Sequence, residues 1–171
     1  MTTSQINKDE YNPYYGPYID IVGEADLMDA LKFSSERFQK MIIDLPVDKL
    51  QYSYGEGKWT VAQIILHLID AERVFQYRAL RFGRNDKTDI PGFEQDDYVA
   101  ESNGNQRTKQ ELLEEFKAVR SSSIQLFKSF SDDLLLRKGT ASGTPMSVRA
   151  IGFVLSGHVL HHMKIINEKY L

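Results

Sequence analysis

The chain has 171 residues, a formal net charge of −3 and no cysteine, with 42% hydrophobic and 26% charged residues. This length suits one domain, residues 1–171, and the composition is that of a soluble globular protein. The lack of cysteine excludes disulfides, thiolate metal sites and a cysteine nucleophile. Lysines and arginines are scattered and form no basic stripe, so no nucleic-acid partner is expected.

The first ten residues show no sign of export, because they lack the basic and apolar segments of a signal peptide. No apolar run elsewhere approaches the length of a membrane span. We therefore expect a cytoplasmic protein without a membrane partner.

Residues 1–22 precede the first expected long helix and include the tyrosine-rich stretch from Tyr11 to Tyr18. Four tyrosines offer a large apolar area, which favours an ordered strap over a loose tail. The strap packs either on its own chain or on a partner subunit, and the sequence leaves both alternatives open.

Two amphipathic helices are expected next. The first spans about 24–44, where apolar residues recur every three or four positions, and Pro46 ends it. The second follows Thr60, which forms a capping-box pattern with Gln63, and reaches about residue 81. We expect these two helices to form an antiparallel pair.

A long polar connection, 83–106, then contains a short helical piece near Tyr98, and a later apolar triplet at 134–136 suggests another short turn of helix. Because the chain must travel between the second and third long helices, a crossover is expected here.

The third long helix opens with a second capping box, Thr108 and Glu111, and its apolar stripe extends to Phe127. Ser147 caps the last helix, which reaches about Tyr170. No strand alternation or hairpin signal is evident. The sequence therefore predicts an all-α fold, a four-helix bundle with a long crossover connection.

Histidines are concentrated near the C-terminus. His158 and His162 are four residues apart in the apolar seam of the last helix, so they project from one face. His67 occupies a matching seam of the second helix. Buried imidazoles need polar partners, and this spacing is typical of ligands that share one transition metal. We expect His67, His158 and His162 to bind one divalent metal ion.

Three further residues are candidates near this site. His161 lies about 100° around the helix from its neighbouring ligand, so it is expected in the pocket wall, where it could assist proton transfer. Asp70 is a second candidate for proton transfer. Asp70 and Glu72 follow His67 by about one turn, where either orients an imidazole or pairs with Arg73 and other cations.

Other metal chemistries fit the sequence less well. His158 is not followed by the glutamate that a zinc protease uses as base. The chain also contains no Glu-x-x-His pair, the pattern that binds the metals of di-iron proteins. Three neutral ligands leave Zn²⁺ or Ni²⁺ a strong Lewis acid that activates water or a thiol. Because the chain has no cysteine, the thiol would be a small molecule.

Two stretches, Lys58 to Arg73 and Ser147 to His162, resemble the DinB-like superfamily. The segments Phe93 to Tyr98 and Glu115 to Arg120 are similar to one branch of it, and the similarity spans roughly residues 23–170. The resemblance implies a four-helix bundle of the DinB/YfiT type, often a homodimer, with a divalent metal held by three histidines that match His67, His158 and His162.

Among the members of this family with known activity, the resemblance points to S-transferases that use low-molecular-weight thiols such as bacillithiol, and to a mycothiol-dependent maleylpyruvate isomerase. The first hypothesis is thus a metal-dependent transferase acting on a small-molecule substrate with a thiol, or with metal-activated water, as nucleophile. The alternative is a non-enzymatic bundle in which the metal is structural or serves a stress-related binding role. A third hypothesis is a binder of small apolar or aromatic ligands.

Overall fold

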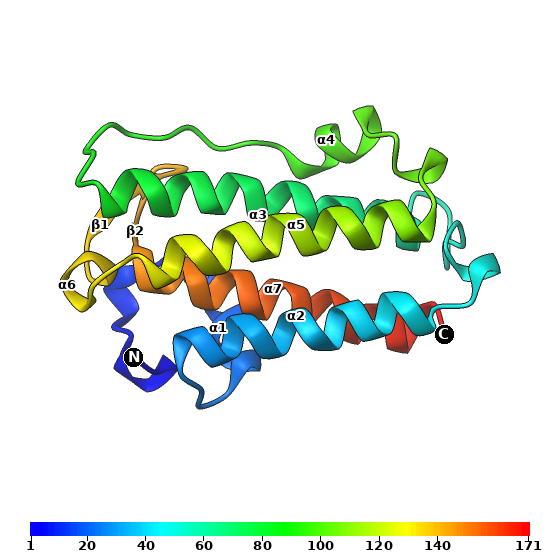
Figure 1. Cartoon of the computed structure of the whole chain (residues 1–171). Helices are drawn as coiled ribbons and strands as arrows, with labels where there is room; N and C mark the ends of the chain where they lie inside the picture. The colour runs from blue at the N-terminus through cyan, green and yellow to red at the C-terminus, as the bar shows by residue number, and fades with distance from the viewer.

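The computed structural model describes all residues, 1–171, and its frame consists of four long helices (Figure 1). They are α2 (Leu27–Asp44), α3 (Val61–Gly83), α5 (Lys109–Lys128) and α7 (Val148–Lys169). The predicted all-α four-helix bundle is confirmed. None of its helices combines the length and apolar character that a membrane crossing needs.

Local capping signals set the starts of three of these helices. Thr60 with Gln63 and Thr108 with Glu111 both form complete capping boxes. The Ser147 hydroxyl accepts a hydrogen bond from the third backbone N–H of α7 at 3.1 Å. These contacts satisfy N–H groups that have no partner inside the helix, which is why the sequence could place them.

The first two long helices are not packing partners. Both α2 and α3 pack on α5 and α7, so they lie diagonally across the bundle. They run in opposite directions, as Figure 1 shows, but the expectation that they form an antiparallel pair is wrong. α3 and α5 are parallel neighbours, and the connection 84–108 crosses back along the bundle to join them (Figure 1).

Shorter elements occupy the connections. The crossover contains α4 (Gln95–Glu101), and α6 (Asp132–Leu135) precedes a hairpin of β1 (Lys138–Ala141) and β2 (Thr144–Ser147). The sequence predicted no strands, and this hairpin shows that the prediction is wrong. The two turn residues, Ser142 and Gly143, have φ angles of 52° and 75°. Such left-handed pairs are typical of tight hairpin turns.

The N-terminal strap is also partly helical. It contains three short 3-10 helices, Thr3–Gln5, Lys8–Glu10 and Pro13–Tyr15, followed by α1 (Gly16–Val22). α1 packs along α7 of its own chain, and the sequence did not predict this helix.

The core consists of two apolar clusters with a layer of buried polar residues between them. This polar layer includes Ser34, His67, Glu72, Arg120 and His158. One apolar cluster contains Phe38, Ile65, Phe116 and Val159, and the other contains Leu31, Phe75, Phe127 and Leu155, each with further members.

Arg120 lies in this layer and links all four long helices. Its guanidinium donates to both Glu72 carboxylate oxygens at 2.7 and 2.9 Å, to the Leu31 carbonyl at 3.0 Å, to Ser34 Oγ at 2.9 Å and to the Leu155 carbonyl at 3.4 Å. Arg120 and Glu72 are both almost fully buried. Both charges are therefore compensated inside the protein.

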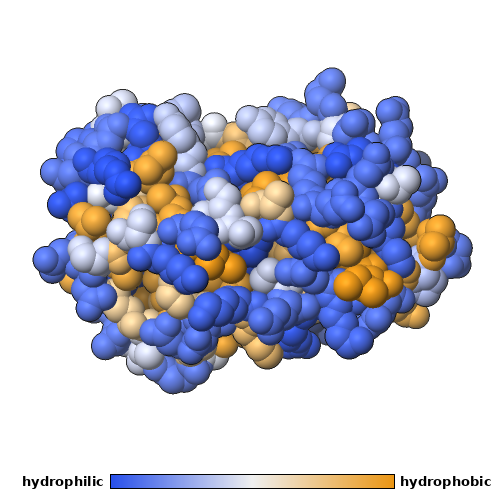
Figure 2. Space-filling view, viewed as in Figure 1, coloured by the Kyte–Doolittle hydropathy of each residue, from blue (hydrophilic) through white to orange (hydrophobic).

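The face in Figure 2 is mainly hydrophilic, with apolar side chains in separated groups. Scattered apolar groups of this kind are ordinary on soluble proteins.

A second buried ion pair fastens the strap to α7. Arg149 Nε donates to Glu10 Oε2 at 2.8 Å, and its Nη2 donates to the other carboxylate oxygen. Burial alone would raise the pKa of Glu10, but the hydrogen bonds from Arg149 and from the Asn7 backbone outweigh it and lower the pKa to about 2. The ionised carboxylate is thus the form that the fold favours.

We predict that Gly157→Ala separates α1 from α7. A β-carbon at this position would lie 1.7 Å from the Tyr18 carbonyl oxygen and 2.4 Å from its carbon, both of them backbone atoms that cannot rotate away. Overpacking of this kind costs about 1–3 kcal/mol, measurable by urea unfolding. Gly16→Ala is the control, because its nearest neighbour is 3.9 Å away. Equal stability of both variants would contradict the prediction.

We also predict that the strap loosens in acid. The Glu10 pKa is about 2 in the folded protein and 4.5 ordinarily. Its contribution to stability is therefore complete above about pH 4.5 and is lost as the pH falls towards 2. The free energy of unfolding, measured at several pH values, should decline less steeply in Glu10→Gln than in the wild type across this window. Identical slopes would show that Glu10 is not responsible.

Candidate metal centre

Three imidazoles from two helices converge in the polar layer of the bundle. His158 Nε2 lies 3.1 Å from the Nε2 atom of His67 and 3.1 Å from that of His162. One nitrogen from each ring lies within 4.8 Å of the others. The helical period of α7 places His158 and His162 on one face, and the packing of α3 on α7 brings His67 to them.

Burial keeps these imidazoles neutral. It lowers the pKa of His67 to about 4, although the Asp96 charge partly offsets this effect. It lowers the pKa of His162 to about 3, with further contributions from His67 and His161. The pKa of His158 falls well below its ordinary value, first through burial and then through the neighbouring residues His162, His67, His161 and Arg120. Neutral imidazole is the form that binds metals.

The donor set fits a divalent metal ion. Each ring nitrogen of a neutral imidazole either donates one proton or offers one lone pair. His158 Nε2 therefore cannot form ordinary hydrogen bonds to the Nε2 atoms of both His67 and His162. A shared cation would accept all three lone pairs. Nitrogens at about 2.0–2.1 Å from a tetrahedral zinc are roughly 3.3 Å apart, close to the two separations of 3.1 Å that His158 makes with His67 and His162.

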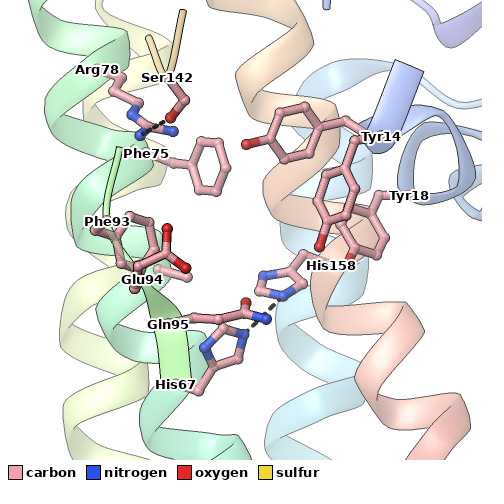
Figure 3. Close-up of a pocket in the computed structure, with 12 residues that line it drawn as sticks. Tyr14, Tyr18, His67, Phe75, Arg78, Phe93, Glu94, Gln95, Ser142 and His158 are labelled. Carbon is pink, nitrogen blue, oxygen red and sulfur yellow. Dashed lines mark hydrogen bonds between the residues drawn. The ribbon is translucent and has the colours of Figure 1, made fainter. Parts of the chain in front are cut away.

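A cavity of about 240 Å³ reaches this centre from one side. Figure 3 shows His67 and His158 at one end, with Arg78 and Ser142 at the other. The walls between them are largely aromatic and come from the strap, α3 and the crossover; they include Tyr14, Tyr15, Tyr18, Phe75 and Phe93. The strap therefore lines a cavity of its own chain.

A second cavity, of about 330 Å³, reaches His162. Trp59 and Tyr170 are among its lining residues, and the Trp59 ring packs against the imidazole of His67 with centroids 4.9 Å apart. Gln95, the first residue of α4, lines both cavities. Its amide lies beside the two imidazoles in Figure 3, so the start of α4 covers the centre between the two approaches.

His161 lies beside the triad but outside it. Its ring centroid is 5.3 Å from that of His162 and 5.1 Å from that of Tyr18, and the side chain is only partly buried. Burial and the nearby charge of Lys164 lower its pKa. His161 is not among the residues that line either of these two cavities, so its place in the pocket wall and its role in proton transfer stay predictions.

Asp70 and Glu72 pair with arginines and not with the imidazoles. Asp70 accepts a hydrogen bond from Arg73 at 3.3 Å and lines a separate cavity that contains no histidine. Glu72 is buried against Arg120. Neither carboxylate forms a hydrogen bond with an imidazole, so the ion-paired alternative describes both residues. The role of Asp70 in proton transfer stays a prediction.

Sequence reasoning did not identify three of the residues that line the first cavity, Tyr18, Gln95 and Ser142. Gln95 and Ser142 lie in connections that carry no chemical signal of their own. Tyr18 contacts the His158 ring with centroids 5.2 Å apart, but the sequence left open what its strap covers. Such contacts depend on long-range packing, which local periodicity does not encode.

The fold and the triad together define a helical bundle with a candidate metal centre. Residues 30–166 match the model of the DinB superfamily, so the chain belongs to that family, as the sequence resemblance predicted. A comparison with curated proteins found no match.

Two solved structures resemble the fold. YfiT from Bacillus subtilis, a probable metal-dependent hydrolase with an unusual four-helix bundle topology, has a TM-score of 0.74 and 14% identity, covering 96% of this chain and 90% of its own. The mycothiol-dependent maleylpyruvate isomerase has a TM-score of 0.66 and 14% identity over 80% of this chain. The match spans 57% of the isomerase. At such identities the likeness shows the fold alone.

We predict that His162→Ala loses most of its bound metal, whereas His161→Ala keeps it, because only the former removes a converging nitrogen. Elemental analysis of protein purified without a nickel column measures both variants beside the wild type. Equal losses in the two variants would show that the assignment of the ligating face is wrong.

Proposed function

We propose that this protein is a metal-dependent enzyme in which His67, His158 and His162 hold one divalent ion, Zn²⁺ or Ni²⁺. The reaction would transfer a low-molecular-weight thiol, or water, to a small electrophilic substrate. The observation that carries the proposal is the convergence of three neutral imidazole nitrogens at the wall of a cavity. The mycothiol dependence of one structural neighbour supports the thiol as cosubstrate.

The bound ion would supply Lewis acidity that lowers the pKa of a coordinated thiol or water. The protein would supply orientation and exclusion of solvent. The aromatic walls of the cavity limit the space around the imidazoles, and the start of α4 closes the gap between the two approaches. A confined site of this kind strengthens electrostatic interactions with a reacting group.

Proton transfer is assigned to side chains at the edge of the centre. His161 is partly exposed and adjacent to His162, so it would carry a proton between the cavity and solvent. Asp70 is the second candidate. Burial raises its pKa, although Arg73 partly offsets this effect, and a proton would have to reach it from the other side of α3. His161 is therefore the better supported of the two.

The second candidate function is structural. The triad lies between the two apolar clusters of the core, where a bound ion would couple α3 to α7 and stabilise the bundle. Under this hypothesis the metal would mainly raise stability, and no small molecule would reach it. The homodimer implied by the family resemblance is compatible with both functions and remains part of the proposal.

Cobalt substitution distinguishes the two functions. A thiol that binds at the metal should change the visible spectrum of the cobalt protein, and the His162→Ala variant should give no such change. We then expect turnover of an electrophile in the presence of a cellular thiol, or hydrolysis of an ester or amide. A spectrum insensitive to every thiol and to pH, together with a large loss of stability on metal removal, would favour the structural role.

A further inference from the structure

The protein contains three almost fully buried arginines, and only two of them have a carboxylate partner. Arg120 is paired with Glu72, and Arg149 is paired with Glu10. The third, Arg78, is 1% exposed and has no acidic group within 4.0 Å. A buried cation without a counter-ion is costly, so this exception requires an explanation.

Most of the hydrogen-bonding capacity of Arg78 is unused. Its Nη2 donates to Ser142 Oγ at 3.1 Å, and this is its one hydrogen bond. Its Nε is buried without a partner. The guanidinium also lies over the Phe75 ring, with its carbon 5.2 Å from the centroid. Because a guanidinium carries five N–H donors, four of them have no partner, and those on the two terminal nitrogens are the ones that an anionic group in the cavity could reach.

Arg78 lies in the same cavity as the metal centre. It follows His67 on α3 by eleven residues, close to three helical turns, so both residues are on one face, with their backbone positions about 16 Å apart along the axis. Figure 3 shows Arg78 and Ser142 at the end of the cavity opposite His67 and His158. Aromatic rings line the space between the two ends.

The partner of Arg78 is held in place by the hairpin. Ser142 has a φ angle of 52°, a conformation that non-glycine residues seldom adopt, and its backbone N–H donates to the Ile90 carbonyl at 3.0 Å. This conformation is the one that the tight hairpin turn requires, so the turn fixes the position of the Ser142 side chain. The hydroxyl therefore orients the guanidinium inside the cavity.

We propose that Arg78, oriented by Ser142, binds the carboxylate of the substrate, which is a small carboxylic acid with a flat or apolar body. The carboxylate of the substrate pairs with Arg78 in the way that Glu72 pairs with Arg120 and Glu10 pairs with Arg149. The aromatic walls contact the body, and the far end of the molecule reaches the triad. This inference rests on the proposed function, because it names the substrate class of the same cavity.

The cavity itself offers one competitor. Glu94 is its one acidic lining residue, is exposed, and lies beyond ion-pair distance of the guanidinium. If Glu94 occupied Arg78 in solution, it would weaken the binding of an acid. Glu94→Gln should therefore leave acid affinity unchanged or increase it.

The test compares acids with their uncharged amides. Phenylacetate, phenylpropionate and cinnamate, each beside its amide, are titrated calorimetrically into metal-free and metal-loaded protein. We expect at least one acid to bind at least tenfold more tightly than its amide in both forms. Arg78→Met should abolish this preference, and Arg78→Lys should reduce it, because lysine cannot form the two-pronged contact.

Arg37→Met is the matched control, because Arg37 is exposed on α2 and contacts the Phe33 ring outside the cavity. It should bind as the wild type does. The melting temperature of Arg78→Met should be unchanged or raised, since a buried unpaired charge is removed, whereas that of Arg120→Met should fall.

Three results would overturn the proposal. The first is that no acid binds more tightly than its amide, and the second is that the preference for the acid persists in Arg78→Met. The third is a fall in the melting temperature of Arg78→Met as large as that of Arg120→Met. Binding of phenyl phosphate, but of no acid, through Arg78 would overturn the choice of carboxylate. If Arg78→Met does not fold, Arg78→Lys decides. Acid binding to metal-free protein tests this site even if the proposed metal chemistry fails.

Discussion

Arg120 makes the contact on which the arrangement of the four helices depends. Its guanidinium, projecting from α5, reaches a carboxylate on α3, two groups on α2 and a carbonyl on α7. A slip of α3 or α5 by one turn would leave Arg120 or Glu72 buried and unpaired, at a cost of about 3–5 kcal/mol. The pair therefore fixes α3, where His67 lies five residues before Glu72, against α5. The hydrogen bond from Arg120 to the Leu155 carbonyl, three residues before His158, relates α7 to the same point.

The same layer also sets the chemistry of the imidazoles. Burial is the main reason that the histidines are neutral, and the positive charge of Arg120 contributes to keeping His158 neutral. The fold thus maintains lone pairs that point at one another, an arrangement that is unfavourable until a cation binds. Arg78 is the complementary case, a cation that lacks an anion. Elsewhere the buried charges are paired internally, so the unpaired groups lie along the two cavities that reach the triad and mark where ligands would bind.

Local chemistry explains which parts of this arrangement could be predicted from the sequence. The capping boxes at Thr60 and Thr108 and the four-residue spacing of His158 and His162 depend on neighbours within one helical turn, and each is legible in the chain. The diagonal placement of α2 and α3 and the hairpin around Ser142 depend on packing between distant segments. The hairpin strands are four residues long, too short to show alternation above background.

The site therefore combines two kinds of structure. The three imidazoles project from α3 and α7, which Arg120 links through Glu72 and the Leu155 carbonyl. Much of the remaining cavity wall comes from segments outside the frame: the strap, the start of α4 and the turn of the hairpin. The strap reaches its place because Gly157, directly before His158, has no side chain and the Tyr18 carbonyl occupies the space where a β-carbon would lie. Changes in these segments would alter which molecules enter the cavity while leaving the converging nitrogens in position, so selectivity and metal chemistry can vary independently in this fold.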